Sequence, residues 1–204
     1  MIKRTLTDKV IALARQFPVV SVIGPRQSGK TTLAKMAFPG YEYISLEEPD
    51  ERDFALADPK GFLRRFAGGV ILDEIQRAPL LLSYIQGIVD IEDLPGHFIL
   101  TGSQQMPLMG RVGQTLTGRT AIVNLLPLSL AELLNRPSRD PSMIDRLPEM
   151  QEKPSFELEM ILHKGLYPRI HDKELIAQDW ISAYYQTYVE RDVREIVNIV
   201  NLDA

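Results

Sequence analysis

Short apolar runs alternate with amphipathic segments over the first 127 residues. Runs at 19–23, 41–46, 68–74, 97–103 and 120–127 predict five strands, and the first, VVSVI, is apolar enough to be buried on both faces. Segments 7–16, 31–38, 53–66 and 79–89 have helical character, with Thr7 as the expected N-cap of the first and an interruption at Pro59. Strands that alternate with helices predict an α/β fold with a parallel five-stranded sheet flanked by helices.

The pattern changes after Pro127. Ser129 is expected to cap a short helix, and the proline-rich stretch 136–155 reads as a linker. Helices are expected at 156–163 and 177–200, the latter with Trp180, Tyr184 and Tyr188 four residues apart on an apolar stripe. We therefore divide the chain into a domain at 1–128 and a small helical segment at 129–204, which we expect to be a truncated piece of something longer.

Composition narrows the class of protein. The chain has 204 residues, 45% hydrophobic and 25% charged, with a net charge of -4, so nucleic-acid binding is not supported by the sequence. There is no cysteine, no secretory signal and no apolar run approaching the roughly 18 residues of a membrane span. These features lead us to expect a cytoplasmic protein without a membrane segment.

The stretch GPRQSGKTT separates the first strand from the following helix. Glycine allows the backbone to curl so that successive N–H groups point at one anion, and the start of a helix adds its own unpaired N–H groups. The lysine supplies positive charge to the β- and γ-phosphates, and the next hydroxyl can bind Mg²⁺. We expect a nucleotide site formed by Gly24, Pro25, Arg26, Gln27, Ser28, Gly29, Lys30, Thr31 and Thr32.

Polar residues follow two of the other expected strands. Asp73 and Glu74 end the third strand, where Asp73 would hold Mg²⁺ and Glu74 would orient and deprotonate an attacking water. Thr101 or Ser103, at the end of the fourth strand, could touch the γ-phosphate or that water, and the sequence does not separate the two. Positive charge on the transition state would come from Arg119 or Arg111, with Arg169 as a weaker candidate.

Taken together, the segments GPRQSGKTTL, GGVILDEIQRAP, FILTGSQ, TGR, LLPLSLAEL and YVERDV resemble one family. They are similar to prokaryotic AAA-type ATPases with an N-terminal P-loop domain and a C-terminal uncharacterised, nuclease-like domain. The resemblance implies an additional-strand P-loop NTPase fold with ATP and Mg²⁺. It implies that Lys30 and Thr31 contact nucleotide and metal, that Asp73 is a metal ligand and Glu74 catalytic, that Ser103 lies near the sensor position, and that Arg119 matches a glycine–arginine pair.

Two functions remain open at this stage, and a third is weaker. The first is a Mg²⁺-dependent ATPase that couples nucleotide state to movement of the helical segment or of an absent C-terminal domain. The second is an ATP-dependent regulatory switch with negligible turnover. A phosphotransferase is the third, although no acceptor site is evident. A homo-oligomer is left open, and the biological process is not indicated.

Overall fold

A computed structural model describes residues 2–103, 115–137 and 158–189 of the chain. The chain divides into two compact units. One is Lys3–Pro127, and the other comprises Leu128–Ala204 together with Met1–Ile2. Each unit is considered by itself below.

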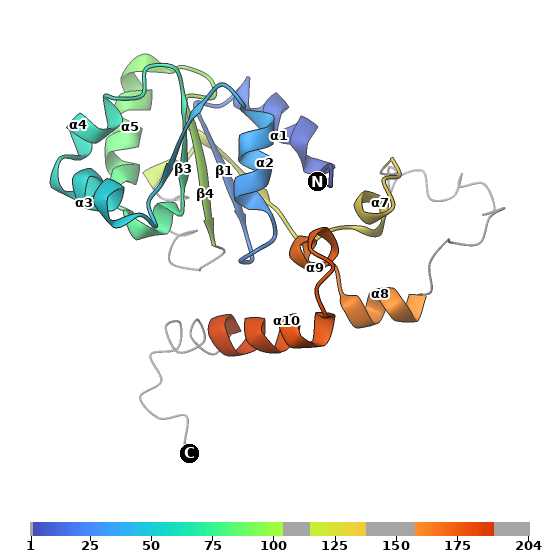
Figure 1. Cartoon of the computed structure of the whole chain (residues 1–204). Coiled ribbons are helices and arrows are strands. Elements are labelled where there is room, and N and C mark those ends of the chain that lie inside the picture. Colours follow the sequence, from blue (N-terminus) through green and yellow to red (C-terminus); the bar gives the residue numbers. More distant parts are fainter. Residues whose placement is uncertain (1, 104–114, 138–157, 190–204) are drawn as a thin grey trace. The chain divides into compact units, whose positions relative to one another are not determined.

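The first unit is built on a five-stranded sheet (Figure 1). The strands are β1 (Val19–Gly24), β2 (Glu42–Ser45), β3 (Val70–Asp73), β4 (Phe98–Ser103) and β5 (Thr120–Asn124), and their order across the sheet is β2-β3-β4-β1-β5. Every neighbouring pair is parallel, so all carboxyl ends meet at one edge of the sheet. The predicted parallel α/β fold is therefore confirmed.

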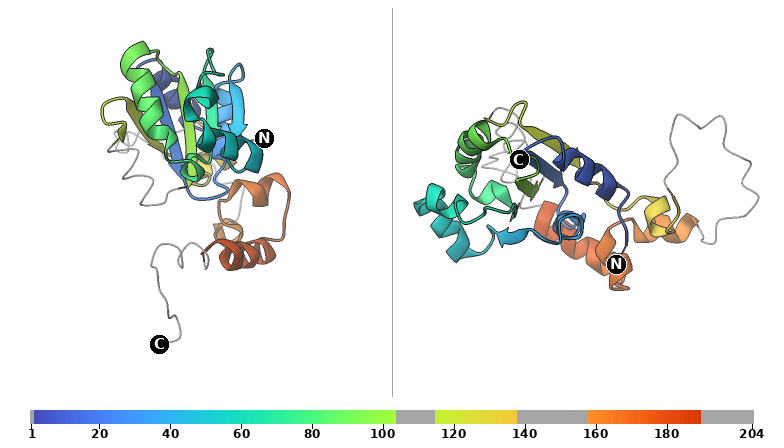
Figure 2. Two further views of the ribbon diagram at one scale, coloured as in Figure 1. Left: turned by 90° about the vertical axis from the view of Figure 1, so that its left-hand side faces the viewer. Right: turned by 90° about the horizontal axis from the view of Figure 1, so that it is seen from above.

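Helices cover both faces of this sheet (Figures 1 and 2). α1 (Leu6–Ala14) and α2 (Lys30–Ala37) pack on one face, whereas α3 (Pro49–Ala57), α4 (Pro59–Leu63) and α5 (Leu81–Glu92) pack on the other. Successive strand residues alternate between the two resulting cores, as the period of two in a strand requires. Val70, Leu72, Phe98 and Leu100 join the α3–α5 core, and Ile71 and Ile99 join the α1–α2 core.

One prediction of local structure is corrected and one is confirmed. Thr7 is not an N-cap, because α1 already begins at Leu6 and the Thr7 hydroxyl instead donates to the carbonyl of Arg4 (2.8 Å). The predicted interruption at Pro59 is confirmed: α3 ends at Ala57 and Pro59 begins α4, since proline suits the first turn, where its missing N–H is not needed. The Asp58 carboxylate caps α4 by accepting from the Gly61 N–H at 2.9 Å.

The second unit contains α7 (Leu130–Leu133), α8 (Leu158–Lys164), α9 (Pro168–Asp172) and α10 (Ala177–Tyr184), which runs into a π-helical turn, η3 (Tyr185–Val189). Ser129 caps α7 through reciprocal hydrogen bonds with Glu132, as predicted. The predicted aromatic stripe packs on itself and on Tyr167, with ring centroids 5.0–5.2 Å apart. Residues 138–155 of the expected linker and 190–200 of the expected helix lie outside the described residues.

Within the described ranges, no helix has the length and apolar character that a membrane crossing needs.

Candidate functional site

The loop Gly24–Thr32, called the phosphate loop below, joins the end of β1 to the start of α2. Gly29 precedes α2 with φ 94°, a left-handed conformation that glycine adopts without steric cost. Gln27 also has a positive φ of 59°, and the Ser28 N–H turns back to the Pro25 carbonyl at 3.3 Å. The chain thus curls just before the N-terminus of α2, where backbone N–H groups lack helical partners.

Gly24 is packed too closely to carry a side chain. A Cβ built on Gly24 would lie 2.1 Å from the carbonyl oxygen of Leu125, the residue that follows β5. The backbone is held there by the Leu125 N–H, which donates to the Ile23 carbonyl at 2.7 Å. The first glycine of the phosphate loop is therefore explained by close backbone approach on the β5 side.

Lys30, the first residue of α2, lies inside the phosphate loop. Its side chain is only 5% exposed, and its ammonium donates to the carbonyls of Gly24 (3.1 Å) and Pro25 (2.9 Å). Burial lowers the pKa of Lys30 below its ordinary value, while the negative charges of Glu74 and Asp73 act in the opposite direction. The ammonium thus lies inside the loop, held by two of its carbonyls.

Asp73, the last residue of β3, accepts hydrogen bonds from three hydroxyls. Thr31 of α2 donates to both carboxylate oxygens (3.0 and 3.1 Å), Tyr43 of β2 donates at 2.9 Å, and Thr101 of β4 also donates. Burial and the adjacent carboxylate raise the pKa of Tyr43, so its phenol keeps the proton that it donates. The two residues expected to bind a metal, Thr31 and Asp73, are therefore in direct contact.

Glu74 follows β3 in a left-handed conformation, with φ 59° and ψ 46°, and begins the short 3-10 turn η1 (Ile75–Arg77). Its carboxylate accepts a hydrogen bond from the Gln76 side-chain amide. A positive φ is uncommon for a residue with a side chain, and such strained residues cluster at functional sites. Glu74 is half-buried, beside Asp73 and within electrostatic reach of Lys30.

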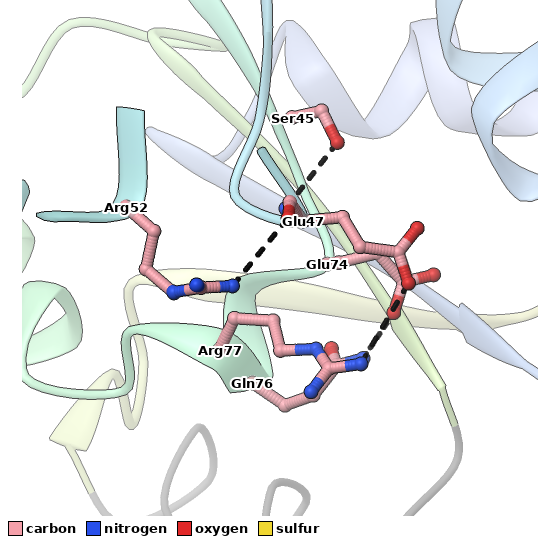
Figure 3. Close-up of polar contacts among 6 residues, drawn as sticks. All are labelled: Ser45, Glu47, Arg52, Glu74, Gln76 and Arg77. Carbon is pink, nitrogen blue, oxygen red and sulfur yellow. Dashed lines mark hydrogen bonds and ion pairs between the residues drawn. The ribbon is translucent and has the colours of Figure 1, made fainter. Parts of the chain in front are cut away.

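Figure 3 draws Glu74 together with charged residues of η1, of the turn after β2 and of α3, which contact one another. Arg77 points to the carboxylate of Glu47, with 3.6 Å between nitrogen and oxygen. Arg52 of α3 donates to the Glu47 carbonyl at 3.4 Å, and the Glu47 N–H donates to the Ser45 hydroxyl at 3.3 Å. Because Glu47 and Arg77 are both exposed, their ion pair adds little to stability and can rearrange.

The structure gives Thr101 and Ser103 different surroundings. Both belong to β4 and are about 1% exposed or less, but the Thr101 hydroxyl is occupied by Asp73. Ser103 pairs in register with Gly24, and its hydroxyl has no hydrogen-bond partner among the described residues. Of the two β4 hydroxyls, that of Ser103 is therefore the one that lies beside the phosphate loop without a hydrogen-bond partner in the described part of the chain.

Arg119 is not brought to this cluster. It precedes β5, and its carbonyl accepts from the N–H of Val19, the first residue of β1, whereas the phosphate loop follows the last. Five steps of about 3.3 Å separate the two ends of β1, or roughly 16 Å. The guanidinium pairs instead with Asp90 of α5, one nitrogen donating at 3.1 Å. Within this unit, Arg119 lies at the edge of the sheet opposite to Lys30 and Asp73.

The remaining predicted residues are more simply placed. Pro25 and Arg26 are half-buried in the phosphate loop, and Gln27 and Thr32 are exposed. Arg169 lies in α9 of the other unit, and Arg111 is outside the described residues.

Two residues of the site were not predicted from the sequence. Tyr43 sits in β2 and carries the Lys35 ammonium 3.2 Å from its ring centroid, in addition to its bond with Asp73. Arg4 is buried and donates to the Ser28 carbonyl of the phosphate loop. The sequence alone could not have identified Tyr43 as a partner of Asp73, because their strands are known to be neighbours only once the strand order is known.

The chemistry of these donors suits a phosphorylated ligand and a hard cation. Loop N–H groups and an ammonium favour phosphate oxygens, while a hydroxyl and a carboxylate are oxygen ligands of the kind that Mg²⁺ takes alongside phosphates. In the described part of the chain, no three His, Asp or Glu side chains are grouped to hold a metal ion. A cation here would therefore take only some of its ligands from the protein.

Comparison with known proteins agrees with this arrangement. A family model described as an AAA domain matches residues 16–134, which include the phosphate loop, the β3 acids and the end of β4. Two curated relatives are similar over 196 residues at 29% identity: the uncharacterized proteins Mb2031c of Mycobacterium bovis and Rv2008c of Mycobacterium tuberculosis. The match covers 95% of this chain, which spans 40% of the length of those relatives.

Solved structures support the same fold at low sequence identity. AMPPCP-bound DnaA from Aquifex aeolicus matches with a TM-score of 0.51 and 15% identity, covering 95% of this chain and 63% of that one. The Walker-type ATPase PABY2304 of Pyrococcus abyssi matches with a TM-score of 0.52 and 14% identity, covering 96% and 75%. At such identities the likeness concerns the fold alone.

The packing at Gly24 can be tested by adding one methyl group. Gly24→Ala should lower the free energy of unfolding by about 2 kcal/mol, because its Cβ would meet the backbone oxygen of Leu125. A backbone atom cannot move aside as the end of a flexible side chain can. Gly40→Ala is the matched control, since nothing lies within 4 Å of its added Cβ. Urea unfolding of both variants measures the difference, and equal midpoints would contradict the close contact.

Proposed function

This chain belongs to the family of AAA domains, and on that premise we propose that it binds ATP with Mg²⁺ and hydrolyses the β–γ bond. Nucleotide state would then be coupled to movement of the helical segment or of a further C-terminal domain. The observation that carries the proposal is the contact of Thr31 with Asp73 beside the buried ammonium of Lys30. The similarity in fold to AMPPCP-bound DnaA supports a nucleotide as the ligand.

Each residue then has a defined task. The phosphate loop and Lys30 bind the phosphates, for which the ammonium leaves the carbonyls of Gly24 and Pro25. Thr31 and Asp73 would hold Mg²⁺, which when bound neutralises charge on the phosphates. The oxygen-only character of this pair fits that ion.

Glu74 supplies the general base. Its carboxylate would accept a proton from water as the water oxygen attacks the γ-phosphorus and the bond to the bridging oxygen of ADP breaks. To do so, the carboxylate must release the Gln76 amide that it accepts from in this structure. The uncommitted hydroxyl of Ser103, in register with Gly24, is suited to contact the γ-phosphate or the water.

Glu74→Gln and Lys30→Ala separate hydrolysis from binding. We expect Glu74→Gln to bind MgATP about as tightly as the wild type but to release phosphate at least about 100-fold more slowly, because the amide cannot accept the proton. Lys30→Ala should lose most of the affinity, since it removes the buried charge in the loop. Calorimetry and a phosphate-release assay measure the two properties.

Glu42→Gln, an exposed change at the start of β2, is the matched control and should change neither property. Equal phosphate release by wild type and Glu74→Gln would show that Glu74 is not the base. No binding of MgATP by the wild type would refute the proposed function.

Thr101→Val and Ser103→Ala test the roles assigned to the two hydroxyls of β4. Thr101→Val removes one of three donors to Asp73, so the Mg²⁺ concentration for half-maximal phosphate release should rise about tenfold. Thr101→Ser keeps the hydroxyl and should therefore have the Mg²⁺ dependence of the wild type. Ser103→Ala should instead lower the maximal rate and leave the Mg²⁺ dependence unchanged. Indistinguishable Mg²⁺ curves for Thr101→Val and Ser103→Ala would contradict this division.

A second candidate function is an ATP-dependent switch with negligible turnover. It is favoured by the contact between Gln76 and Glu74, which occupies the proposed base. Under this function, MgATP alters the protease sensitivity of the wild type while phosphate release stays near background, and Gln76→Ala raises that release by freeing Glu74. Fast release by the wild type with no change in Gln76→Ala would exclude the switch in favour of the ATPase.

A further inference from the structure

Arg4 is a buried cation that the proposed chemistry does not use. Its side chain is 7% exposed, and it stands before α1, outside the residues 16–134 that match the AAA domain. One terminal nitrogen donates to the carbonyl of Ser28 at 2.6 Å. The other donates to the carbonyls of Leu126 (2.6 Å) and Pro127 (3.2 Å). Burying a charge costs free energy unless it is hydrogen-bonded, so these three carbonyls are what allow Arg4 to be buried here.

On the side of the phosphate loop, Arg4 fixes a peptide plane. Because a trans peptide is planar, the Ser28 carbonyl and the Gly29 N–H point in opposite directions. A guanidinium that holds this carbonyl outside the loop therefore turns the Gly29 N–H away from itself. Gly29 is at φ 94° and has no Cβ, so its own conformational preference does little to hold this orientation.

On its other side, Arg4 holds the segment that leaves the sheet after β5. Leu125 still bonds to β1 through the Ile23 carbonyl, whereas Leu126 and Pro127 present their carbonyls to Arg4. Pro127 is the last residue of the first unit, and the next residue, Leu128, donates its N–H to Leu166 within the second. Leu126–Pro127 is thus the end of the first unit, from which the chain continues into Leu128 of the second.

The guanidinium is rigid and planar, so its two terminal nitrogens move together. A shift of the Ser28 carbonyl would therefore pull on the same guanidinium that holds the carbonyls of Leu126 and Pro127. We propose that Arg4 is a positioning residue that orients the Ser28–Gly29 peptide for phosphate binding and couples occupancy of the phosphate loop to the Leu126–Pro127 segment. The inference rests on the proposed nucleotide binding and extends it to a residue outside the matched domain.

Affinity for MgATP tests the first half of the proposal, that Arg4 orients the Ser28–Gly29 peptide for phosphate binding. Arg4→Ala should raise the dissociation constant about tenfold, because the peptide N–H that faces the phosphates loses its orientation. Arg15→Ala, which removes an exposed arginine just after α1, is the matched control and should leave the affinity unchanged. Calorimetry measures both. Equal affinities for wild type, Arg4→Ala and Arg15→Ala would overturn the positioning role.

A spectroscopic signal tests the coupling, which a merely structural role of Arg4 would not produce. The chain has no cysteine, so Leu126→Cys, at a side chain that is 64% exposed, can be labelled alone with an environment-sensitive dye. We expect saturating MgATP to change the emission of this variant. Arg4→Lys in the same background keeps the charge but replaces two nitrogens by one, and should abolish most of the change at saturation.

The outcomes separate this inference from the proposed function. If unlabelled wild type does not bind MgATP, both fail together. If it binds but the labelled Leu126→Cys variant does not respond, or responds equally with Arg4→Lys, the coupling is wrong and the proposed function stands. If Arg4→Ala does not fold, the affinity of Arg4→Lys decides the first half: a loss of severalfold supports the role of the two-nitrogen geometry, and no loss overturns it.

Discussion

The carboxylate of Asp73 is the contact on which the rest of the site depends. A buried carboxylate is stable only when its oxygens accept hydrogen bonds, and these come from α2, β2 and β4 through Thr31, Tyr43 and Thr101. The three donors reach it because parallel strands end at one edge and α2 begins beside that edge. One charged group thus fixes the start of α2 and two strands relative to one another. A cation that binds next to the Asp73 carboxylate would therefore change its hydrogen bonds to α2, β2 and β4 together.

The phosphate loop, in contrast, is constrained mainly by backbone packing and not by a buried charge. β1 lies between β4 and β5, so the loop that follows it is bounded by Ser103 on one side and by Leu125 on the other. Gly24 permits the second contact, and the Lys30 ammonium closes the loop on its own carbonyls. The interior position of β1 in the sheet therefore helps to give the curled loop the defined shape that a cradle of N–H groups requires.

The elements and residues that the sequence predicted correctly are those encoded locally. Apolar runs identified the five strands, and the reciprocal bonds of Ser129 and Glu132 lie within one turn of helix. Contacts that depend on strand order were not predictable: Tyr43 reaches Asp73 only because β2 neighbours β3. Arg4 is 24 residues from Ser28 and 122 from Leu126, beyond any local pattern. Arg119 looked close because it follows the fourth strand in sequence, yet a residue that precedes a parallel strand lies at the amino edge, opposite to the site.

Two buried cations flank the same stretch of loop and impose different demands on it. Arg4 is matched by carbonyls of Ser28, Leu126 and Pro127, whereas Lys30 has a pKa that burial lowers. The loss of hydration around the Lys30 charge is therefore only partly offset by Glu74, Asp73 and the loop carbonyls, and an anion of several negative charges would offset it further. If a polyphosphate binds, relief of this unfavourable desolvation would contribute to its binding free energy. The contact of Arg4 with Ser28 already orders one side of the loop in the free protein, so that less of this gain would be lost to ordering the loop on binding.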